Sequence, residues 1–408
     1  MTTTMNTTDK AVQKQKLPRA AKRMLGLLQR LNVGTLHVHG PEGYAQAFGT
    51  HQAPFATIHI HRWDMCAEVL KSGDIGFAEG YMAGDWTTPA LPDLMRLVIA
   101  NRREIEGAIY GHWLGRLAYR VKHLLNRNTR TNSRKNIHAH YDLGNAFYEL
   151  WLDETMNYSS AWFDGDHTQP MADAQKAKVR RALRMVNAKP GDRVLEIGCG
   201  WGALAEAATT EFGAHITGVT LSTKQLAFAN ARMNRNGVSA QADLRLQDYR
   251  DIQDASFDAV CSIEMIEAVG QEYWPTYFQT VSRVLKPGGR ACIQSIVIDD
   301  AFFDRYVHST DFIQQYIFPG GCLPSPSEFK KQAQAAGLRV VDAFAFGPDY
   351  AETLRRWRES FMARLSEVKM LKFDDRFIHL WEFYLAYCEA AFDEANIDVI
   401  QFTLVKPD

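Results

Sequence analysis

The chain has 408 residues, of which 46% are hydrophobic and 23% are charged. These are ordinary values for a globular protein, and the length is enough for two domains. They exclude a disordered tail protein, a collagen-like repeat and a disulfide-rich mini-protein. The 46 Lys and Arg residues nearly balance the 47 Asp and Glu residues, so the net charge of −1 indicates no polyanionic partner.

The six cysteines are scattered and include no Cys-x-x-Cys pair. Zinc and thioredoxin-type sites therefore have no support, and we expect no metal site. The N-terminus lacks the apolar core of a secretory signal, and no stretch approaches the roughly 18 apolar residues of a membrane span. We expect a cytoplasmic protein with reduced thiols.

The N-terminal third of the chain predicts a small α/β domain after a flexible tail at residues 1–16. Residues 17–31 have apolar positions at helical spacing, with basic residues between them. Residues 56–63 predict a strand, and the glycines of residues 73–86 predict a loop. We place this domain at residues 17–125.

A basic stretch follows at residues 107–141, where no acidic residue occurs and aromatic residues separate the positive charges. One interpretation is a solvated interdomain helix and linker. The other is a surface that docks on anionic lipid, where each basic residue contributes on the order of 1 kcal/mol. We expect no nucleic-acid partner, because no nucleic-acid-binding module accompanies the charge.

Strands and helices alternate regularly after residue 170, which predicts βαβ units and a parallel sheet. The expected strands are at residues 192–198, 215–221, 257–264, 290–298 and 398–406. The expected helices are at residues 174–186, 203–212, 224–235, 274–285, 351–366 and 374–394. The aromatic side chains of the last helix could form core packing or line a tunnel.

The segment VLEIGCGWGALAEAA is a strand, a glycine-rich turn and a helix, a pattern typical of nucleotide-binding loops. It also satisfies the dinucleotide pattern G-x-G-x-x-G/A. Three features favour S-adenosylmethionine over NAD. Glu196 lies two residues before the first glycine, the bulky Trp201 crowds the loop, and the following strand ends at Thr220 without an acid for a ribose.

Several segments together resemble the cyclopropane-fatty-acyl-phospholipid synthase family, which includes mycolic acid cyclopropane synthases. The segments are NIHAHYDLGNAFYELWLDETMNYSSAWF, VLEIGCGWG, GVTLSTKQ, LQDYRD, EMIEAVG, YIFPGGCLPS and FGPDYAETL. The resemblance implies a class I S-adenosylmethionine methyltransferase fold, Rossmann-like with a mostly parallel seven-stranded sheet, and a smaller N-terminal α/β lipid-docking domain. It places a basic linker and active-site lid at residues 126–170 and the catalytic domain at residues 171–408.

The implied reaction transfers a methylene from S-adenosylmethionine across the double bond of an unsaturated acyl chain in membrane phospholipid, through a carbocation. The resemblance implies these cofactor-binding residues: Tyr158, Ser159, Glu196, Gly198, Gly200, Gly202, Thr220, Gln225, Asp248 and Tyr249. It also implies a peripheral enzyme on an anionic membrane surface, at the inner face of the membrane. A homodimer is left open.

A hallmark of the family is a bound bicarbonate that acts as the base. The residues matching its pocket are Ser160, Glu267, Gln294, the backbone of Ile296, and Tyr350. Ser160 stands where the family usually has cysteine, although its hydroxyl can still donate a hydrogen bond. Gln294 stands where many bacterial members have histidine, but it matches the plant-type branch.

Two rival functions remain open at this point. If the base is misplaced, the cation loses a different proton, and the product is a methyl- or methylene-branched chain without a ring. A lipid-surface binding protein that has lost catalysis is the second rival, although Glu196, Glu267 and Tyr350 argue against it. The double-bond position, the lipid head group and any part of His138 and His140 in the site are not predicted.

Overall fold

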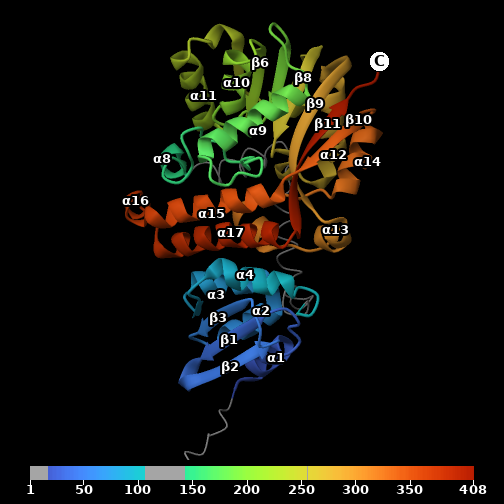
Figure 1. Cartoon of the computed structure of the whole chain (residues 1–408). Helices are drawn as coiled ribbons and strands as arrows, with labels where there is room; N and C mark the ends of the chain where they lie inside the picture. The colour runs from blue at the N-terminus through green and yellow to red at the C-terminus, as the bar shows by residue number, and fades with distance from the viewer. Residues whose placement is uncertain (1–16, 106–142, 255) are drawn as a thin grey trace, which may run out of the picture.

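The computed structural model describes residues 17–105, 143–254 and 256–408. The expected tail, the basic stretch at residues 107–141, His138 and His140 lie outside the described residues. The described chain is built around two sheets, with a pair of long helices between them (Figure 1).

The N-terminal part, residues 17–105, folds around a four-stranded sheet of order β2-β1-β3-β4. Strands β1 and β3 are parallel, and the other pairs are antiparallel. Its strands are β1 (Thr35–Gly40), β2 (Tyr44–Gly49), β3 (Phe55–Ile60) and β4 (Trp86–Thr87). Its helices are α1 (Arg19–Leu28), α2 (Asp64–Ser72), α3 (Asp74–Met82) and α4 (Leu91–Ala100).

The glycine-rich loop expected at residues 73–86 is wrong, because most of this segment forms helix α3. The glycines inside the helix serve close packing, whereas Gly73 and Gly84, with φ angles of 67° and 73°, form the turns at its two ends. A Cβ atom on Gly76 would lie 2.4 Å from the backbone oxygen of Glu68 in α2, and one on Gly80 would lie 3.1 Å from the ring of Trp86. The absence of a side chain at these positions lets α2 and β4 approach α3 closely.

The C-terminal part contains a seven-stranded sheet of order β10-β11-β9-β8-β5-β6-β7. Only β11 is antiparallel to its two neighbours, so the expected mostly parallel seven-stranded sheet is confirmed. The strands are β5 (Arg193–Ile197), β6 (His215–Thr220), β7 (Ala242–Leu246), β8 (Phe257–Ile263), β9 (Leu285–Ile298), β10 (Arg339–Ala345) and β11 (Ile397–Val405).

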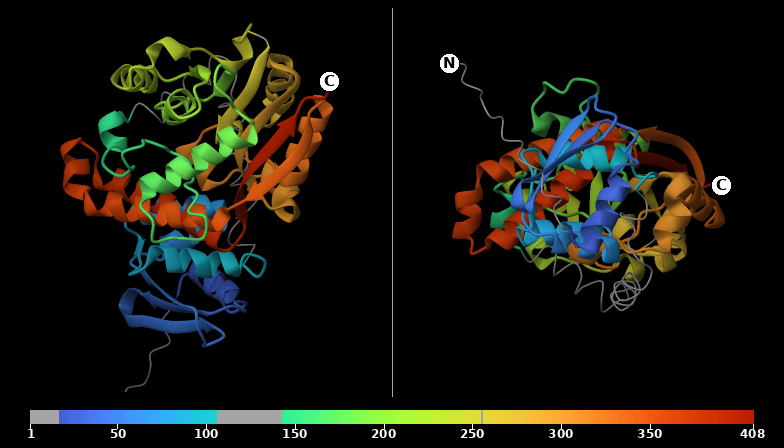
Figure 2. Two further views of the ribbon diagram at one scale, coloured as in Figure 1. Left: turned by 45° about the horizontal axis from the view of Figure 1, so that its top comes forward. Right: turned by 90° about the horizontal axis from the view of Figure 1, so that it is seen from below.

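Helices cover both faces of this sheet (Figure 2). One face packs against α9 (Met171–Met185), α10 (Ala203–Thr210) and α11 (Thr223–Arg235), and the other against α12 (Trp274–Val284) and α14 (Pro326–Ala335). The shorter helices are α8 (Asn145–Tyr148), α13 (Asp300–Val307) and α16 (Leu365–Met370). No helix within the described ranges is both long enough and apolar enough to cross a membrane.

Helices α15 (Gly347–Ala363) and α17 (Asp375–Asp393) connect the two parts. Helix α17 packs against α15 on one side and against α3 and α4 on the other. Arg96 of α4 donates hydrogen bonds to Glu389 at 2.7 Å and to Asp393 at 2.6 Å, and Tyr81 of α3 donates to Glu382 at 2.8 Å. The N-terminal part is therefore held against the catalytic sheet through α17.

Candidate active site

The glycine loop between β5 and α10 lies at the carboxyl edge of the parallel strands, where open α/β sheets bind ligands. Gly198, Gly200 and Gly202 have φ angles of 91°, 50° and 83°, which favour glycine. The backbone N–H groups of Gly198 and Cys199 both donate to the carbonyl of Val219 in β6, at 3.0 Å. This attachment fixes the loop beside the end of the neighbouring strand.

A cavity of about 170 Å³ opens above this loop. Nine of the ten expected cofactor residues line it: Tyr158, Ser159, Glu196, Gly198, Gly200, Thr220, Gln225, Asp248 and Tyr249. Gly202 lies behind the loop instead, where a Cβ atom would be 3.0 Å from that of Ala229. Its absent side chain allows α10 and α11 to pack closely, so its contribution to the cavity is indirect.

Glu196 is 3% exposed, and its Oε2 has no hydrogen-bond partner within the described part of the chain. Burial raises the pKa of Glu196 to about 8, although Lys178 opposes the shift. A buried acceptor facing the cavity suits the amino or hydroxyl donors of S-adenosylmethionine. The residues present therefore fit this cofactor.

Lys178 and Arg250 are polar side chains of this region that the sequence patterns did not reveal. Lys178 is fully buried, donates to the hydroxyl of Ser159 at 2.5 Å, and has a pKa lowered to about 8 by burial. Arg250 pairs with Asp248 at 2.6 Å. In the sequence, the buried position of Lys178 could be inferred only from its helical spacing, which places it on the same face of α9 as the buried Ala174 and Ala182.

A second, larger cavity of about 330 Å³ extends from the N-terminal part to the catalytic sheet. Its apolar lining includes Met24 and Leu28 of α1, Leu94 of α4, and Phe383 and Tyr387 of α17. We call it the acyl cavity, and the first one the cofactor cavity, after the ligands that the family resemblance implies. Three residues line both cavities, which therefore meet at Tyr158, Glu264 and Ala268.

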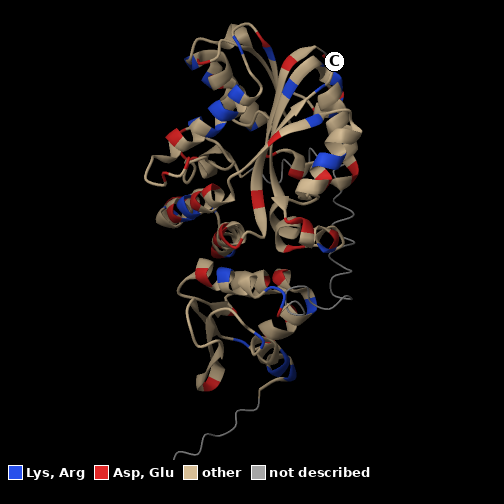
Figure 3. Cartoon of the chain, turned by 45° about the vertical axis from the view of Figure 1, so that its right-hand side comes forward, with Lys and Arg blue, Asp and Glu red and all other residues tan. Residues whose placement is uncertain are grey.

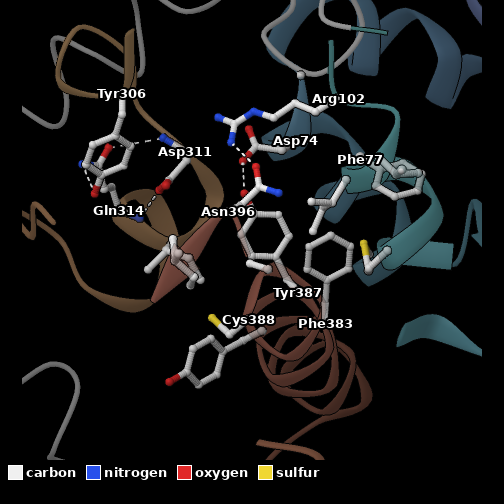
Figure 4. Close-up of a pocket in the computed structure, with 18 of the residues that line it drawn as sticks. Asp74, Phe77, Arg102, Tyr306, Asp311, Gln314, Phe383, Tyr387, Cys388 and Asn396 are labelled. Carbon is white, nitrogen blue, oxygen red and sulfur yellow. Dashed lines mark hydrogen bonds between the residues drawn. The ribbon is translucent and has the colours of Figure 1, made fainter. Parts of the chain in front are cut away.

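A cluster of polar side chains lines the acyl cavity where the two parts of the protein meet (Figure 4). The backbone N–H of Phe312 donates to Asp74 at 3.1 Å, and Arg102 donates to Asn396 at 2.8 Å. Burial raises the pKa of Asp311, while burial and then the charge of Asp311 raise the pKa of Asp74. Both carboxyl groups therefore resist ionisation.

The expected bicarbonate pocket is assembled, but a side chain of the protein fills its centre. The carboxylate of Glu264 accepts the backbone N–H of Ser160 at 2.9 Å, the amide of Gln294 at 2.7 Å and the hydroxyl of Tyr350 at 2.6 Å. The hydroxyl of Ser160 donates to the carbonyl of Ala161 instead. The donors expected to hold bicarbonate therefore do not fit a separate anion, because the side chains of Glu264 and Glu267 already engage them.

Glu267 lies beside this group, and one of its oxygens accepts the backbone N–H of Ile296. Its other oxygen is buried without a hydrogen-bond partner among the described residues. Burial, followed by the charge of Glu264, raises the pKa of Glu267 to about 8. Burial also raises the pKa of Glu264, but Lys178 and the donors of Tyr350, Ser160 and Gln294 oppose that shift.

The orientation of Glu264 is fixed from two directions. Its backbone has a φ of 49°, an uncommon conformation for a residue other than glycine, and its N–H donates to the carbonyl of Gln294 at 2.9 Å. The side chain of Gln294 accepts from Gln401 at 2.9 Å, and Gln401 accepts from Arg181 at 2.7 Å. This chain of hydrogen bonds turns the amide N–H of Gln294 toward Glu264.

Comparison with known proteins gives the family. The sequence profile described as mycolic acid cyclopropane synthetase matches residues 128–402. The chain belongs to this family. The family resemblance seen in the sequence motifs is thereby confirmed, and this member of the mycolic acid cyclopropane synthetase family is an S-adenosylmethionine-dependent methyltransferase.

Two relatives of this family member match most of its length. The tuberculostearic acid methyltransferase UfaA1 of Mycobacterium tuberculosis is 40% identical over 373 residues, which are 90% of this chain and 86% of the relative. The cyclopropane-fatty-acyl-phospholipid synthase of Escherichia coli K12 is 33% identical over 347 residues, which are 85% of this chain and 87% of the relative. The relatives thus include both a cyclopropane synthase and a fatty-acid methyltransferase.

A solved structure supports the cofactor of this family. The mycolic acid cyclopropane synthase CmaA1, complexed with SAH and CTAB, is 30% identical with a TM-score of 0.63. The match covers 67% of this chain and 98% of that chain. The class I S-adenosylmethionine methyltransferase fold and the use of S-adenosylmethionine are both confirmed.

Proposed function

We propose that the protein converts unsaturated acyl chains of membrane phospholipids into cyclopropane chains, with S-adenosylmethionine as the donor. The observation that carries this proposal is the meeting of the two cavities at Tyr158, Glu264 and Ala268. An acyl chain in the apolar cavity brings its double bond to the point where the cofactor cavity opens.

The junction suits a reaction that passes through a carbocation. Aromatic faces stabilise a cation by roughly 0.5–2 kcal/mol each, and the rings of Tyr158, Tyr350 and Tyr384 line the acyl cavity at or beside the junction. The hydroxyl groups of Tyr158 and Tyr384 are 2.8 Å apart and satisfy one another. An apolar enclosure of this kind keeps water from capturing the cation.

Membrane docking through the N-terminal part belongs to the same proposal. In α1, Arg19, Lys22 and Arg23 are exposed, while Met24 and Leu28 line the acyl cavity. Figure 3 shows the Lys and Arg positions of this helix, coloured blue on the ribbon, at the end of the molecule away from the seven-stranded sheet. Positive charge outside and an apolar lining inside support docking on an anionic phospholipid surface, with the protein peripheral to the cytoplasmic face.

A second candidate product is a methylene- or methyl-branched chain formed without ring closure. The 40% identity to a tuberculostearic acid methyltransferase favours it. A methylene branch requires a hydride shift to the cation before the proton is lost, and a methyl branch then requires an added reductant. The two products therefore differ in what happens after the same methyl transfer.

The test is incubation with S-adenosylmethionine and vesicles of unsaturated phosphatidylglycerol, followed by mass and proton-NMR analysis of the released fatty acids. Upfield ring protons would support the cyclopropane product, and vinylidene protons without ring signals would support the branched one. Vesicles of fully saturated lipid are the control. No one-carbon gain with any unsaturated lipid would overturn the proposed substrate.

A further inference from the structure

The carboxylate of Glu264 is held by donors from three separate segments and lies where the two cavities meet. We propose that Glu264 is the base that takes the proton from the transferred carbon, in place of a bound bicarbonate. This inference rests on the proposed function and adds the identity of its base.

Position distinguishes Glu264 from the neighbouring Glu267. Glu264 lines both the cofactor cavity and the acyl cavity, whereas Glu267 lines the acyl cavity alone. The transferred carbon must pass from one cavity to the other, so it passes the carboxylate of Glu264. Glu267 instead accepts the backbone N–H of Ile296 in β9, where it supports the wall of the pocket.

Charge also assigns different roles to the two acids. Glu264 receives three hydrogen bonds and the attraction of buried Lys178, all of which favour its ionised form. Glu267 faces the negative charge of Glu264 and is buried, so it retains its proton to a higher pH. Two neighbouring carboxyl groups in such different environments divide into one base and one neutral group.

The proposed ring formation balances in atoms and electrons with the alkene, S-adenosylmethionine and Glu264 alone. The π electrons of the alkene form a bond to the methyl carbon of S-adenosylmethionine, the methyl–sulfur bond breaks, and its electron pair stays on sulfur. The adjacent chain carbon becomes cationic. Glu264 then takes a proton from the new methyl group, and the C–H electron pair forms the bond that closes the ring.

A carboxylate is a strong enough base for this step. A C–H bond beside a carbocation is very acidic, so the hydrogen bonds that lower the basicity of Glu264 do not prevent proton transfer. They hold the carboxylate in one orientation, and the left-handed backbone at φ 49° is the strained conformation that this orientation requires.

The first arm of the test uses the unaltered protein and measures ring formation in CO₂-free buffer with and without 10 mM bicarbonate. We expect equal rates. A rise of fivefold or more on adding bicarbonate would overturn the inference, and this result does not depend on the folding of any variant.

The second arm uses Glu264→Gln and Glu264→Gly. We expect Glu264→Gln to reduce ring formation at least 100-fold while the Kd for S-adenosylmethionine changes less than threefold. Glu264→Gly relieves the positive φ and exposes the donors of Ser160, Gln294 and Tyr350, so formate or bicarbonate should restore activity saturably. The matched control is Glu272→Gln, the same change at an exposed carboxylate on the following turn, which should retain the wild-type rate.

The outcomes separate this inference from the function on which it rests. If the wild-type protein binds S-adenosylmethionine but modifies no unsaturated lipid, the proposed function fails. If the wild-type protein forms rings and Glu264→Gln does so at a similar rate, only the assignment of the base fails. Absence of rescue in a folded Glu264→Gly protein also counts against the assignment, because the three donors would then be free to bind an anion.

Discussion

The cofactor cavity and the acyl cavity are built in contrasting ways. The cofactor cavity gathers most of its residues from the ends of neighbouring strands and the turns that follow them, each within a short stretch of sequence. The acyl cavity combines α1, β3 and α4 with α17, whose sequences are hundreds of residues apart. The first depends on local backbone geometry, and the second on how two parts of the protein pack together.

The largest effect is expected from Gly198→Ala in the cofactor cavity. A left-handed backbone costs an L-residue roughly 1–2 kcal/mol, and the new Cβ would lie 3.0 Å from Met265, which must then move in the same cavity. We expect binding of S-adenosylmethionine to weaken on the order of 100-fold by calorimetry. Gly191→Ala is the matched control, since Gly191 has a φ of 82° and open space around it. If both variants weakened binding of S-adenosylmethionine equally, the backbone geometry at Gly198 itself would not determine the shape of this cavity.

Tyr350→Phe acts where the two cavities meet. It removes the hydroxyl that donates to Glu264 at 2.6 Å, and a hydrogen bond to a charged group contributes about 1.5–3 kcal/mol. We expect ring formation to fall about 10-fold or more, with an unchanged Kd for S-adenosylmethionine. Tyr44→Phe removes an exposed hydroxyl of the N-terminal part and should have no effect. Weaker binding of S-adenosylmethionine by Tyr350→Phe would show instead that the hydroxyl of Tyr350 supports the cofactor cavity.

A smaller effect is expected from Cys388→Phe in the acyl cavity. Cys388 lies beside Tyr387 and Phe383 on α17 (Figure 4), and a larger side chain there takes space from the lipid. We expect kcat/KM for an 18-carbon unsaturated phospholipid to fall about fivefold and cofactor binding to stay the same. Cys388→Ala, which removes bulk, should lose less. If kcat/KM fell equally in Cys388→Phe and Cys388→Ala, the size of the side chain at this position would not determine how well the lipid is used.

The smallest effect is expected on the pH dependence of stability, from Asp74 at the interface between the N-terminal and C-terminal parts. The folded-state pKa of Asp74 is raised, so its stabilising contribution is complete below its usual pKa and is lost as the pH rises through the folded-state value. Asp74→Asn should therefore increase the free energy of unfolding by about 1 kcal/mol at pH 8, measured by thermal denaturation, with little gain at pH 4.

The control for this change is Asp64→Asn, which alters an exposed acid of α2 and should give the same small change at both pH values. If Asp74→Asn stabilised the protein more at pH 4 than at pH 8, the pH dependence would be the opposite of the expected one. Ionisation of the buried carboxylate would then be excluded as the cause. This result would also mean that ionisation of Asp74 does not strain the interface around the acyl cavity.

The contrast between the cavities also explains what the sequence could predict. Gly198, Gly200 and Glu196 were found because the strand, turn and helix that place them are contiguous. Glu264 was missed, since its three donors come from residues 160, 294 and 350, which only the folded sheet brings together. The available signal was an acid at the carboxyl end of the strand expected at residues 257–264, three residues before the acid that we assigned to the pocket.

The aromatic helix expected at residues 374–394 shows the same limit. Core packing is confirmed for some residues of α17, whereas the acyl tunnel stays a prediction that rests on other residues of the same helix. Phe377 and Trp381 pack against Phe147, whereas Phe383 and Tyr387 line the acyl cavity. Helical periodicity places residues on faces, but it does not say that one face of α17 meets α8 and another meets α3.

The length of the acyl cavity has a consequence for substrate choice. The cavity extends from α1 to Glu264. If an acyl chain occupies it, as we propose, only the carbons at a fixed distance from α1 reach the junction. A double bond a few carbons nearer to or farther from the head group would stop short of the junction or pass beyond it. Under the proposed function, the spacing between the two parts of the protein therefore sets the position of the double bond that is modified.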